Sequence, residues 1–288
     1  MPESGRISPI DCELNTVESW VFYTQRWHSL LLVGALMSEI GRTRTGIAGL
    51  DEVLEGGLPR NYVHSVVGPP GAGKTIMGAQ FLFRGATQYA ENGLYVSLEE
   101  PTHSFANAMM RFNWNMFDLE SQGKLVLVDA SPQQEEPGGE LKIRGGVLGT
   151  EKFDLDGLVG VVANARKRVA ARRCVIDSLA SIAGIYGNES EFRYKLLQFY
   201  RALSELELTT LVLTEYPAPV VENFGVETIL AEGSFLLHNI REKDMITQML
   251  EIQKMRGVRV VKKILSYRIT SEGFEVRPQE LAFKVVQE

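Results

Sequence analysis

The segment Gly68–Thr75 reads GPPGAGKT and matches the phosphate-binding loop pattern G-x-x-x-x-G-K-[ST] in full. The apolar run YVHSVVG at residues 62–68 leads into it, and a helical pattern continues from Thr75 to Tyr89. A strand, a glycine-rich loop and a helix in this order are typical of nucleotide-binding α/β folds. We therefore predict a phosphate site where this helix begins, because free backbone N–H groups and the helix dipole attract anions there.

The loop residues have separate predicted roles. Its glycines let the backbone curve around phosphate with the N–H groups pointing inward. We expect Lys74 to contact the outer phosphates of ATP and the Thr75 hydroxyl to bind Mg²⁺. The expected nucleotide-binding residues of the loop are Gly68, Pro69, Pro70, Gly71, Ala72, Gly73, Lys74 and Thr75.

A second apolar run, CVIDS at residues 174–178, ends in Asp177. We predict that this carboxylate holds Mg²⁺, directly or through water. An aspartate after an apolar strand is common by itself, but the intact phosphate loop favours the functional role. We expect the neighbouring Ser178 to support the site or to cap a helix.

The run LYVSLEEP at residues 94–101 places Glu99 and Glu100 at the carboxyl edge of a sheet, where open α/β sheets bind ligands. Adjacent carboxylates at a strand end point in different directions. One can act as general base on a water in line with the γ-phosphate, while the other supports a loop or the metal shell. Either glutamate fits the role of base, and two ordinary surface charges are the alternative interpretation.

From Tyr62 onward, β-like apolar runs alternate with amphipathic helical stretches. This pattern predicts an α/β fold with a mainly parallel sheet covered by helices on both faces, and the last part of the chain favours an antiparallel strand extension. The predicted strands are 62–68, 94–98, 124–130, 174–178 and 210–215, the helices are 75–89, 154–169 and 189–207, and the antiparallel strands are 234–240, 247–255, 263–270 and 274–278.

Length, composition and charge limit the class of protein. With 288 residues, 44% hydrophobic and 23% charged, one main globular domain is expected, at 41–288, after an N-terminal extension at 1–40 that is a helix or a disordered tail. The net charge of −6 weighs against nucleic-acid binding. Two distant cysteines favour a reducing, cytoplasmic location. The apolar run within 20–37 is short and follows acidic residues, so no membrane insertion is expected.

A longer series of motifs carries a family resemblance. The lead-in TGIAGLDEVLEGGLPRNYVHSVVGPPGAGKT at 45–75 is followed by YVSLEEP, GKLVLVDASP, KFDLDGL, RRCVIDSLASI, TTLVLTE, LEIQKMRG and YRITSEGFEV. In order and spacing this chain resembles a single domain of the KaiC-like ATPases of the RecA superfamily, over nearly all of 44–276. The resemblance implies a RecA-like P-loop core that binds ATP between subunits of a ring, expected to be a homohexamer. It also implies slow, Mg²⁺-dependent hydrolysis coupled to conformational or assembly change, and a regulatory protein partner.

The same resemblance assigns residues late in the chain. In LEIQKMRG, strand alternation puts Lys254 and Arg256 on one face. In the similar motif of the family, these two basic residues reach the γ-phosphate of ATP on the adjacent subunit; a solvated strand end is the alternative. In TTLVLTE, Thr214 and Glu215 match the strand end that senses the γ-phosphate in RecA-like cores, although buried strand caps would look the same.

The chain also departs from the family pattern. Two-domain clock proteins of this family carry a phosphorylatable Ser-Thr pair, whereas here Thr228 stands beside Ile229, so autokinase activity is not expected. With one P-loop in these 288 residues, a double ring built from one chain is not expected. Asn61 replaces the usual glycine before the first core strand, and asparagine can adopt the same left-handed conformation.

Three functions remain open from the sequence. The first is an ATP hydrolase that remodels a partner or its own ring, and the second is a nucleotide-gated scaffold with incidental hydrolysis. The third is a recombinase-like ATPase on DNA, which we rank last. The expected mobile loop at 131–152 mixes acidic with basic residues, and the basic run at 166–173 lies at a helix C-terminus, where cations complement the dipole.

Overall fold

The protein is described here from a computed structural model. The structure describes residues 41–130, 154–215, 225–242, 245–259 and 264–281. The expected N-terminal extension at 1–40 and the expected mobile loop at 131–152 lie outside these residues.

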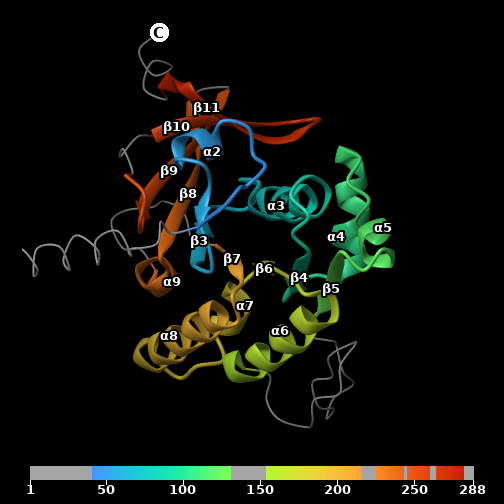
Figure 1. The fold of residues 1–288 in the computed structure, drawn as a ribbon. Helices are drawn as coiled ribbons and strands as arrows, with labels where there is room; N and C mark the ends of the chain where they lie inside the picture. Colours follow the sequence, from blue (N-terminus) through green and yellow to red (C-terminus); the bar gives the residue numbers. More distant parts are fainter. Residues whose placement is uncertain (1–40, 131–153, 216–224, 243–244, 260–263, 282–288) are drawn as a thin grey trace, which may run out of the picture. The chain divides into compact units, whose positions relative to one another are not determined.

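One large sheet organises the described part of the chain. Its nine strands follow the order β11-β10-β9-β8-β3-β7-β6-β4-β5 (Figure 1). The strands β3, β7, β6, β4 and β5 pair in parallel. They span β3 (Val63–Val67), β4 (Gly93–Ser97), β5 (Leu125–Asp129), β6 (Arg173–Asp177) and β7 (Thr209–Thr214).

The C-terminal strands extend this parallel core. β8 pairs in parallel with β3 on one side and antiparallel with β9 on the other, and β9, β10 and β11 continue as antiparallel neighbours. The extension comprises β8 (Gly233–Glu242), β9 (Met245–Met255), β10 (Ile264–Thr270) and β11 (Gly273–Leu281). The predicted fold class is confirmed, including the antiparallel extension.

Helices cover both faces of the parallel core, which explains its apolar sequence. Every residue of β3, β4 and β7 is buried. On one face α3 (Lys74–Gln88) packs against β4, β6 and β7, and on the other α6 (Leu155–Val169) and α8 (Glu189–Glu205) pack together over β3, β4 and β5 (Figure 1). The shorter elements are α2 (Leu50–Val53), α4 (Thr102–Met109), the 3-10 turn η1 (Met110–Phe112), α5 (Met116–Ser121), α7 (Ala180–Ala183), α9 (Val226–Leu230) and the strand pair β1 (Arg42–Thr43) and β2 (Leu58–Pro59).

Local sequence signals set the helix boundaries. The Asp154 carboxylate accepts a hydrogen bond from the Gly157 amide at the start of α6, and Asn188 caps α8 through the amide of Glu191. Asn61 has a φ of 63°, the left-handed conformation expected from its place before β3.

The basic run at 166–173 is not one exposed patch. Arg173 is completely buried in β6, where it pairs with Glu91 and its guanidinium lies 4.5 Å from the centroid of the Phe81 ring. Arg166 and Arg172 both pair with the carboxylate of Glu207. Arg173 is thus removed from the surface, and Arg166 and Arg172 share one carboxylate, whereas Lys167 and Arg168 are exposed.

The hairpin of β10 and β11 supports the phosphate loop from behind. The Tyr267 hydroxyl donates a hydrogen bond of 2.7 Å to the carbonyl oxygen of Ala72, and both residues are buried. The side-chain amide of Gln80 in α3 donates to the carbonyl oxygen of Phe274 and accepts from its backbone amide. The C-terminal extension therefore helps to fix the conformation of the loop.

Candidate functional site

A cavity of about 410 Å³ lies at the carboxyl ends of the parallel strands. This edge is the position where open α/β sheets bind ligands. Residues from four separate motifs line the cavity. The lining residues are Pro70, Gly71, Gly73, Lys74, Thr75, Ile76, Glu99, Glu100, Asp177, Ser178 and Glu215. The other residues of the phosphate loop, Gly68, Pro69 and Ala72, do not line the cavity.

Lys74 is held by three acceptors. Its Nζ atom donates to the carbonyl oxygens of Gly68 and Pro69, at 2.9 and 3.1 Å, and to Oε1 of Glu215 at 3.0 Å. The lysine side chain is only 7% exposed, whereas that of Glu215 is 42% exposed. The buried cation is thus satisfied by a carboxylate that borders the solvent-accessible side of the cavity.

Thr75 and Asp177 form the second part of the site. The Thr75 hydroxyl donates to Oδ2 of Asp177 at 2.7 Å, and the Tyr95 hydroxyl donates to the same oxygen at 3.1 Å. Burial raises the pKa of Asp177, and these two hydrogen bonds oppose that rise because they favour the ionised carboxylate.

This pair suits Mg²⁺ by its chemistry. A hydroxyl and a carboxylate are hard oxygen donors, and both border the cavity. Among the described residues no group of three His, Cys, Asp or Glu side chains is placed to hold a metal ion. A site of one carboxylate and one hydroxyl, completed by water and substrate phosphates, is the form in which proteins usually bind Mg²⁺.

The two adjacent glutamates have different surroundings. Oε1 of Glu99 accepts hydrogen bonds from the hydroxyls of Ser178 and Ser181, at 2.7 and 2.8 Å. The pKa of Glu100 is raised, first by burial and then by the charges of Asp177 and Glu99. Glu99 is therefore anchored, and Glu100 is the carboxylate with the perturbed electrostatics.

The ends of β4 and β6 are tied together beneath these carboxylates. The amide of Leu98 donates to the carbonyl oxygen of Asp177 at 2.6 Å, and the Ser97 hydroxyl donates to the carbonyl oxygen of Glu100 at 2.5 Å. The peptide bond between Asp177 and Ser178 is cis. These contacts fix the backbone on which the candidate residues stand.

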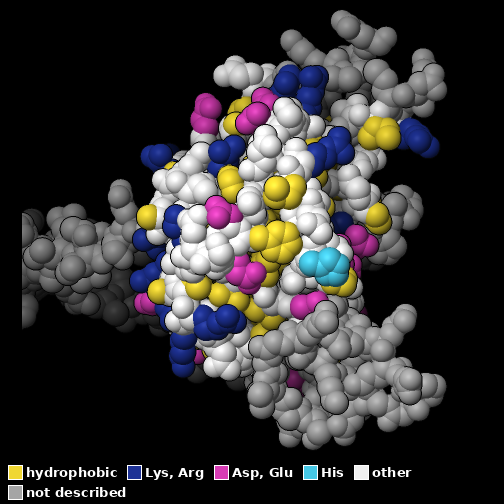
Figure 2. Space-filling view, turned by 90° about the vertical axis from the view of Figure 1, so that its right-hand side faces the viewer, with side chains coloured by type: hydrophobic (Ala, Val, Ile, Leu, Met, Phe, Trp, Pro, Cys, Tyr) yellow, Lys and Arg dark blue, Asp and Glu magenta, His cyan; other side chains and the backbone are white. Residues whose placement is uncertain are grey.

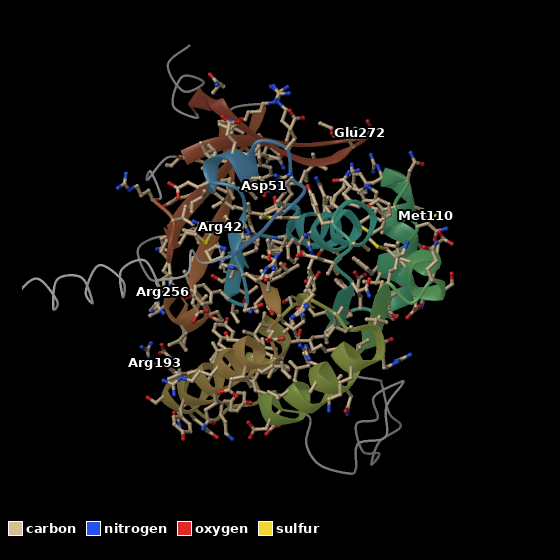
Figure 3. All side chains as sticks on the ribbon, in the orientation of Figure 1. Arg42, Asp51, Met110, Arg193, Arg256 and Glu272 are labelled. Atoms are coloured by element: carbon tan, nitrogen blue, oxygen red, sulfur yellow. The ribbon has the colours of Figure 1, made fainter. Side chains whose placement is uncertain are left out.

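Three further candidate residues, outside the phosphate loop, do not line the cavity. Thr214 is buried at the end of β7, where its carbonyl oxygen accepts the Gly68 amide. Lys254 lies at the end of β9, and its Nζ donates to the carbonyl oxygen of Ile229 at 2.7 Å. The side chain of Arg256 is 67% exposed and points outward beside the β8 and β9 edge (Figure 3). Within one chain, Lys254 and Arg256 are apart from the site.

Sequence reasoning missed two features of the site. The first is the Tyr95 hydroxyl, which reaches Asp177 from the neighbouring strand; a polar group in the fully buried run GLYVS was the available signal, because buried hydroxyls need partners. The second is the partner of Ser178. This residue was expected to support the site, but its hydrogen bond to Glu99, which it shares with Ser181, was not predicted.

The surface adds two observations. On the face shown in Figure 2, apolar and acidic side chains occupy the middle, with Lys and Arg around the margin. Within the part of the chain that the structure describes, no helix is long and apolar enough to cross a membrane.

Comparisons with known proteins agree with this geometry. The family model described as "ATPase: KaiC" matches residues 43–281. The circadian clock oscillator protein KaiC of Synechococcus elongatus is 32% identical over 241 residues, which are 83% of this chain and 44% of that protein. KaiC 1 of Synechocystis sp. is 31% identical, with the same coverage of both chains. The chain thus spans less than half the length of these relatives.

A solved structure gives a match over its whole length. The crystal structure of a KaiC-like protein from the archaeon Pyrococcus horikoshii is similar with a TM-score of 0.69 and 30% identity, covering 83% of this chain and 100% of that one. With its P-loop, its RecA-like sheet order and these matches, the chain belongs to the KaiC family of ATPases.

Proposed function

We propose that this protein binds ATP at residues 68–75 and hydrolyses it slowly with Mg²⁺. The observation that carries the proposal is the meeting of Lys74, Thr75, Asp177 and the glutamate pair around one cavity, although they come from distant parts of the sequence. Phosphoryl transfer needs this combination of positive charge, metal-binding oxygens and a base.

The loop residues bind and orient the substrate. The backbone amides of the loop and the N-terminus of α3 face the phosphates, and Lys74 exchanges Glu215 for the outer phosphate oxygens. Thr75 and Asp177 would hold Mg²⁺, which neutralises phosphate charge when it is bound.

Glu100 is our candidate for the general base. Glu99 already accepts two serine hydroxyls, so we assign it to holding the segment after β6 in place. Glu100 borders the same cavity, and burial and the neighbouring Asp177 and Glu99 charges raise its pKa, which makes the carboxylate a better proton acceptor. It would take the proton of the water that attacks the γ-phosphate. We propose that Glu215, once freed from Lys74, senses that phosphate, and that Thr214 supports this role from the buried end of β7.

We further propose that residues 41–288 act as one domain of a homohexameric ring. Lys254 and Arg256 are cationic and lie away from the cavity of their own chain, so they are available to a neighbour's ATP. Turnover would then drive conformational or assembly change and act on a regulatory partner. The sequence motif at 250–257 supports this arrangement through its resemblance to the family finger motif.

A steady-state hydrolysis assay on the full chain, with and without Mg²⁺, tests the proposal when it is run beside nucleotide binding and native mass measurement. Turnover that requires Mg²⁺ supports it. ATP binding without turnover favours the nucleotide-gated scaffold, and the absence of binding contradicts both functions.

A further inference from the structure

Tyr95 places a hydroxyl under the candidate metal site. Its side chain is completely buried in β4, and its hydroxyl lies 3.1 Å from Oδ2 of Asp177. The residue is not among those that line the cavity, whereas Asp177 is. We therefore expect Tyr95 to act on the chemistry through Asp177.

The position of this hydroxyl is closely constrained. The Tyr95 ring stacks on the ring of Phe105 in α4, with centroids 3.7 Å apart and planes inclined by 8°. In the sheet, Tyr95 pairs with Val175 of β6 and Ser97 pairs with Asp177, so the tyrosine stands two residues below the aspartate on the neighbouring strand. Because backbone and ring are both held, the hydroxyl is a fixed point for the carboxylate.

Two donors meet on one carboxylate oxygen. Thr75 and Tyr95 both donate to Oδ2 of Asp177. Thr75 is itself expected to bind the metal ion through its oxygen, whereas Tyr95 contacts only the carboxylate and is held by the sheet and by Phe105. Oxygen ligands that are held by a neighbouring donor need less reordering when a metal binds.

We propose that Tyr95 is a positioning residue that orients the Asp177 carboxylate for Mg²⁺ at the ATP site. This inference rests on the proposed function and adds a residue to it. Phenylalanine at position 95 keeps the ring and its stacking on Phe105 but removes the donor. Loss of a partner that holds a metal ligand typically lowers metal affinity about 10- to 100-fold.

The test measures metal binding itself. Mn²⁺ is titrated against the full chain saturated with a non-hydrolysable ATP analogue, and free Mn²⁺ is followed by electron paramagnetic resonance. Tyr95→Phe is compared with the control Tyr200→Phe, which also removes a buried tyrosine hydroxyl. The Tyr200 hydroxyl lies in α8 and donates to the carbonyl oxygen of Glu227. We expect about a 10- to 100-fold weaker Mn²⁺ affinity for Tyr95→Phe alone. Affinity for the analogue without metal should stay at the wild-type value in both variants.

Each outcome is decisive. Equal Mn²⁺ affinity in wild type and Tyr95→Phe overturns the positioning role, even if the variant unfolds at a lower temperature. Wild-type protein that binds neither analogue nor Mn²⁺ overturns the proposed function instead. If Tyr95→Phe does not fold, Phe105→Leu is the second variant, because it keeps the Tyr95 hydroxyl but removes the ring that holds it. It should weaken Mn²⁺ binding while the affinity for the analogue without metal stays unchanged. An unchanged Mn²⁺ affinity in Phe105→Leu would contradict the positioning role of Tyr95.

Discussion

Lys74 and Glu215, 141 positions apart in the sequence, form an ion pair with 3.0 Å between Nζ and Oε1. The pair joins the phosphate loop to the end of β7. Since Lys74 is nearly buried, its charge needs a partner before nucleotide arrives. We expect bound phosphate to displace Glu215 from Lys74, so that the carboxylate competes with the substrate.

Glu215→Gln should bind ATP more tightly. The change removes a competitor for Lys74 and a negative charge beside the phosphates. Because Glu215 is substantially exposed, the pair is screened, and we expect a gain of about two- to fivefold in affinity. Isothermal titration calorimetry measures it, with Glu207→Gln as a control at another ion-paired, exposed glutamate. Weaker binding by Glu215→Gln would show that this carboxylate assists rather than competes.

Glu100→Gln should bind ATP and hydrolyse it about 10²- to 10⁴-fold more slowly, because the general base is lost. Glu99→Gln is the matched variant, which keeps an oxygen acceptor for Ser178 and Ser181 and should lose less activity. Single-turnover hydrolysis under saturating ATP and Mg²⁺ separates the two. A larger loss in Glu99→Gln would reverse the assignment of the base.

Arg256→Ala should bind nucleotide nearly as the wild type does and yet lose most of its turnover. Fingers supplied by a neighbouring subunit contribute on the order of 10³ to 10⁵ in rate in other NTPases, an upper range for a slow enzyme. The side chain is largely exposed and forms an ion pair with Glu232, with 4.0 Å between Nη1 and Oε1. Turnover and nucleotide affinity are measured on the same preparation.

Mixing two inactive variants tests whether Arg256 acts between subunits. A Lys74→Ala subunit cannot use its own site, but it can lend Arg256 to an Arg256→Ala neighbour, so mixed rings should regain activity. Native mass spectrometry establishes that both variants share a ring. Mixed rings that stay inactive would favour a solvated strand end.

His64 should make the protein sensitive to acid. It is completely buried in β3, and burial lowers its pKa from 6.5 to about 4, although the Pro59 carbonyl opposes the shift. The unfolded chain therefore binds a proton that the folded chain excludes between these values. The stability that neutral His64 contributes is complete above pH 6.5 and is lost as the pH falls toward 4.

Urea unfolding at pH 7 and pH 4.5 measures this contribution as a difference between wild type and His64→Gln. The variant should be less stable than wild type at pH 7, and the difference in their free energies of unfolding should be smaller by roughly 2 kcal/mol at pH 4.5. Taking the difference matters because Glu100 and Asp177 have raised pKa values, which act in the opposite direction. His103→Gln, at an exposed position, is the control. A gap that is independent of pH would contradict the account of His64.

The sheet and the long helices were predictable because their signals are local. Buried runs such as 62–68 and 210–215 became strands within a residue or two, and the helix expected at 75–89 runs from Lys74 to Gln88. The short helices α2, α4, α5, α7 and α9 were not predicted, since one or two turns show too little periodicity.

At the site, too, the features with a local sequence signal were predicted and those that depend on the order of the strands were not. The phosphate loop, Asp177 and the glutamate pair were found as motifs, and the structure places them around one cavity. The Tyr95 contact depends on β4 lying beside β6, and the Lys74 ion pair depends on β7 lying beside β3. Strand order is a property of the whole sheet, so no local pattern indicates these contacts.

ATP binding by Lys74→Ala tests the central claim most directly. Removal of this charge leaves phosphate uncompensated and should cost about 1.5–3 kcal/mol, roughly a 10- to 100-fold rise in the dissociation constant. Calorimetric titration of wild type, Lys74→Ala and the exposed control Lys167→Ala should show tight binding, strongly weakened binding and unchanged binding in that order. Equal ATP affinity in folded Lys74→Ala and wild type would contradict the assignment of residues 68–75 as the ATP site.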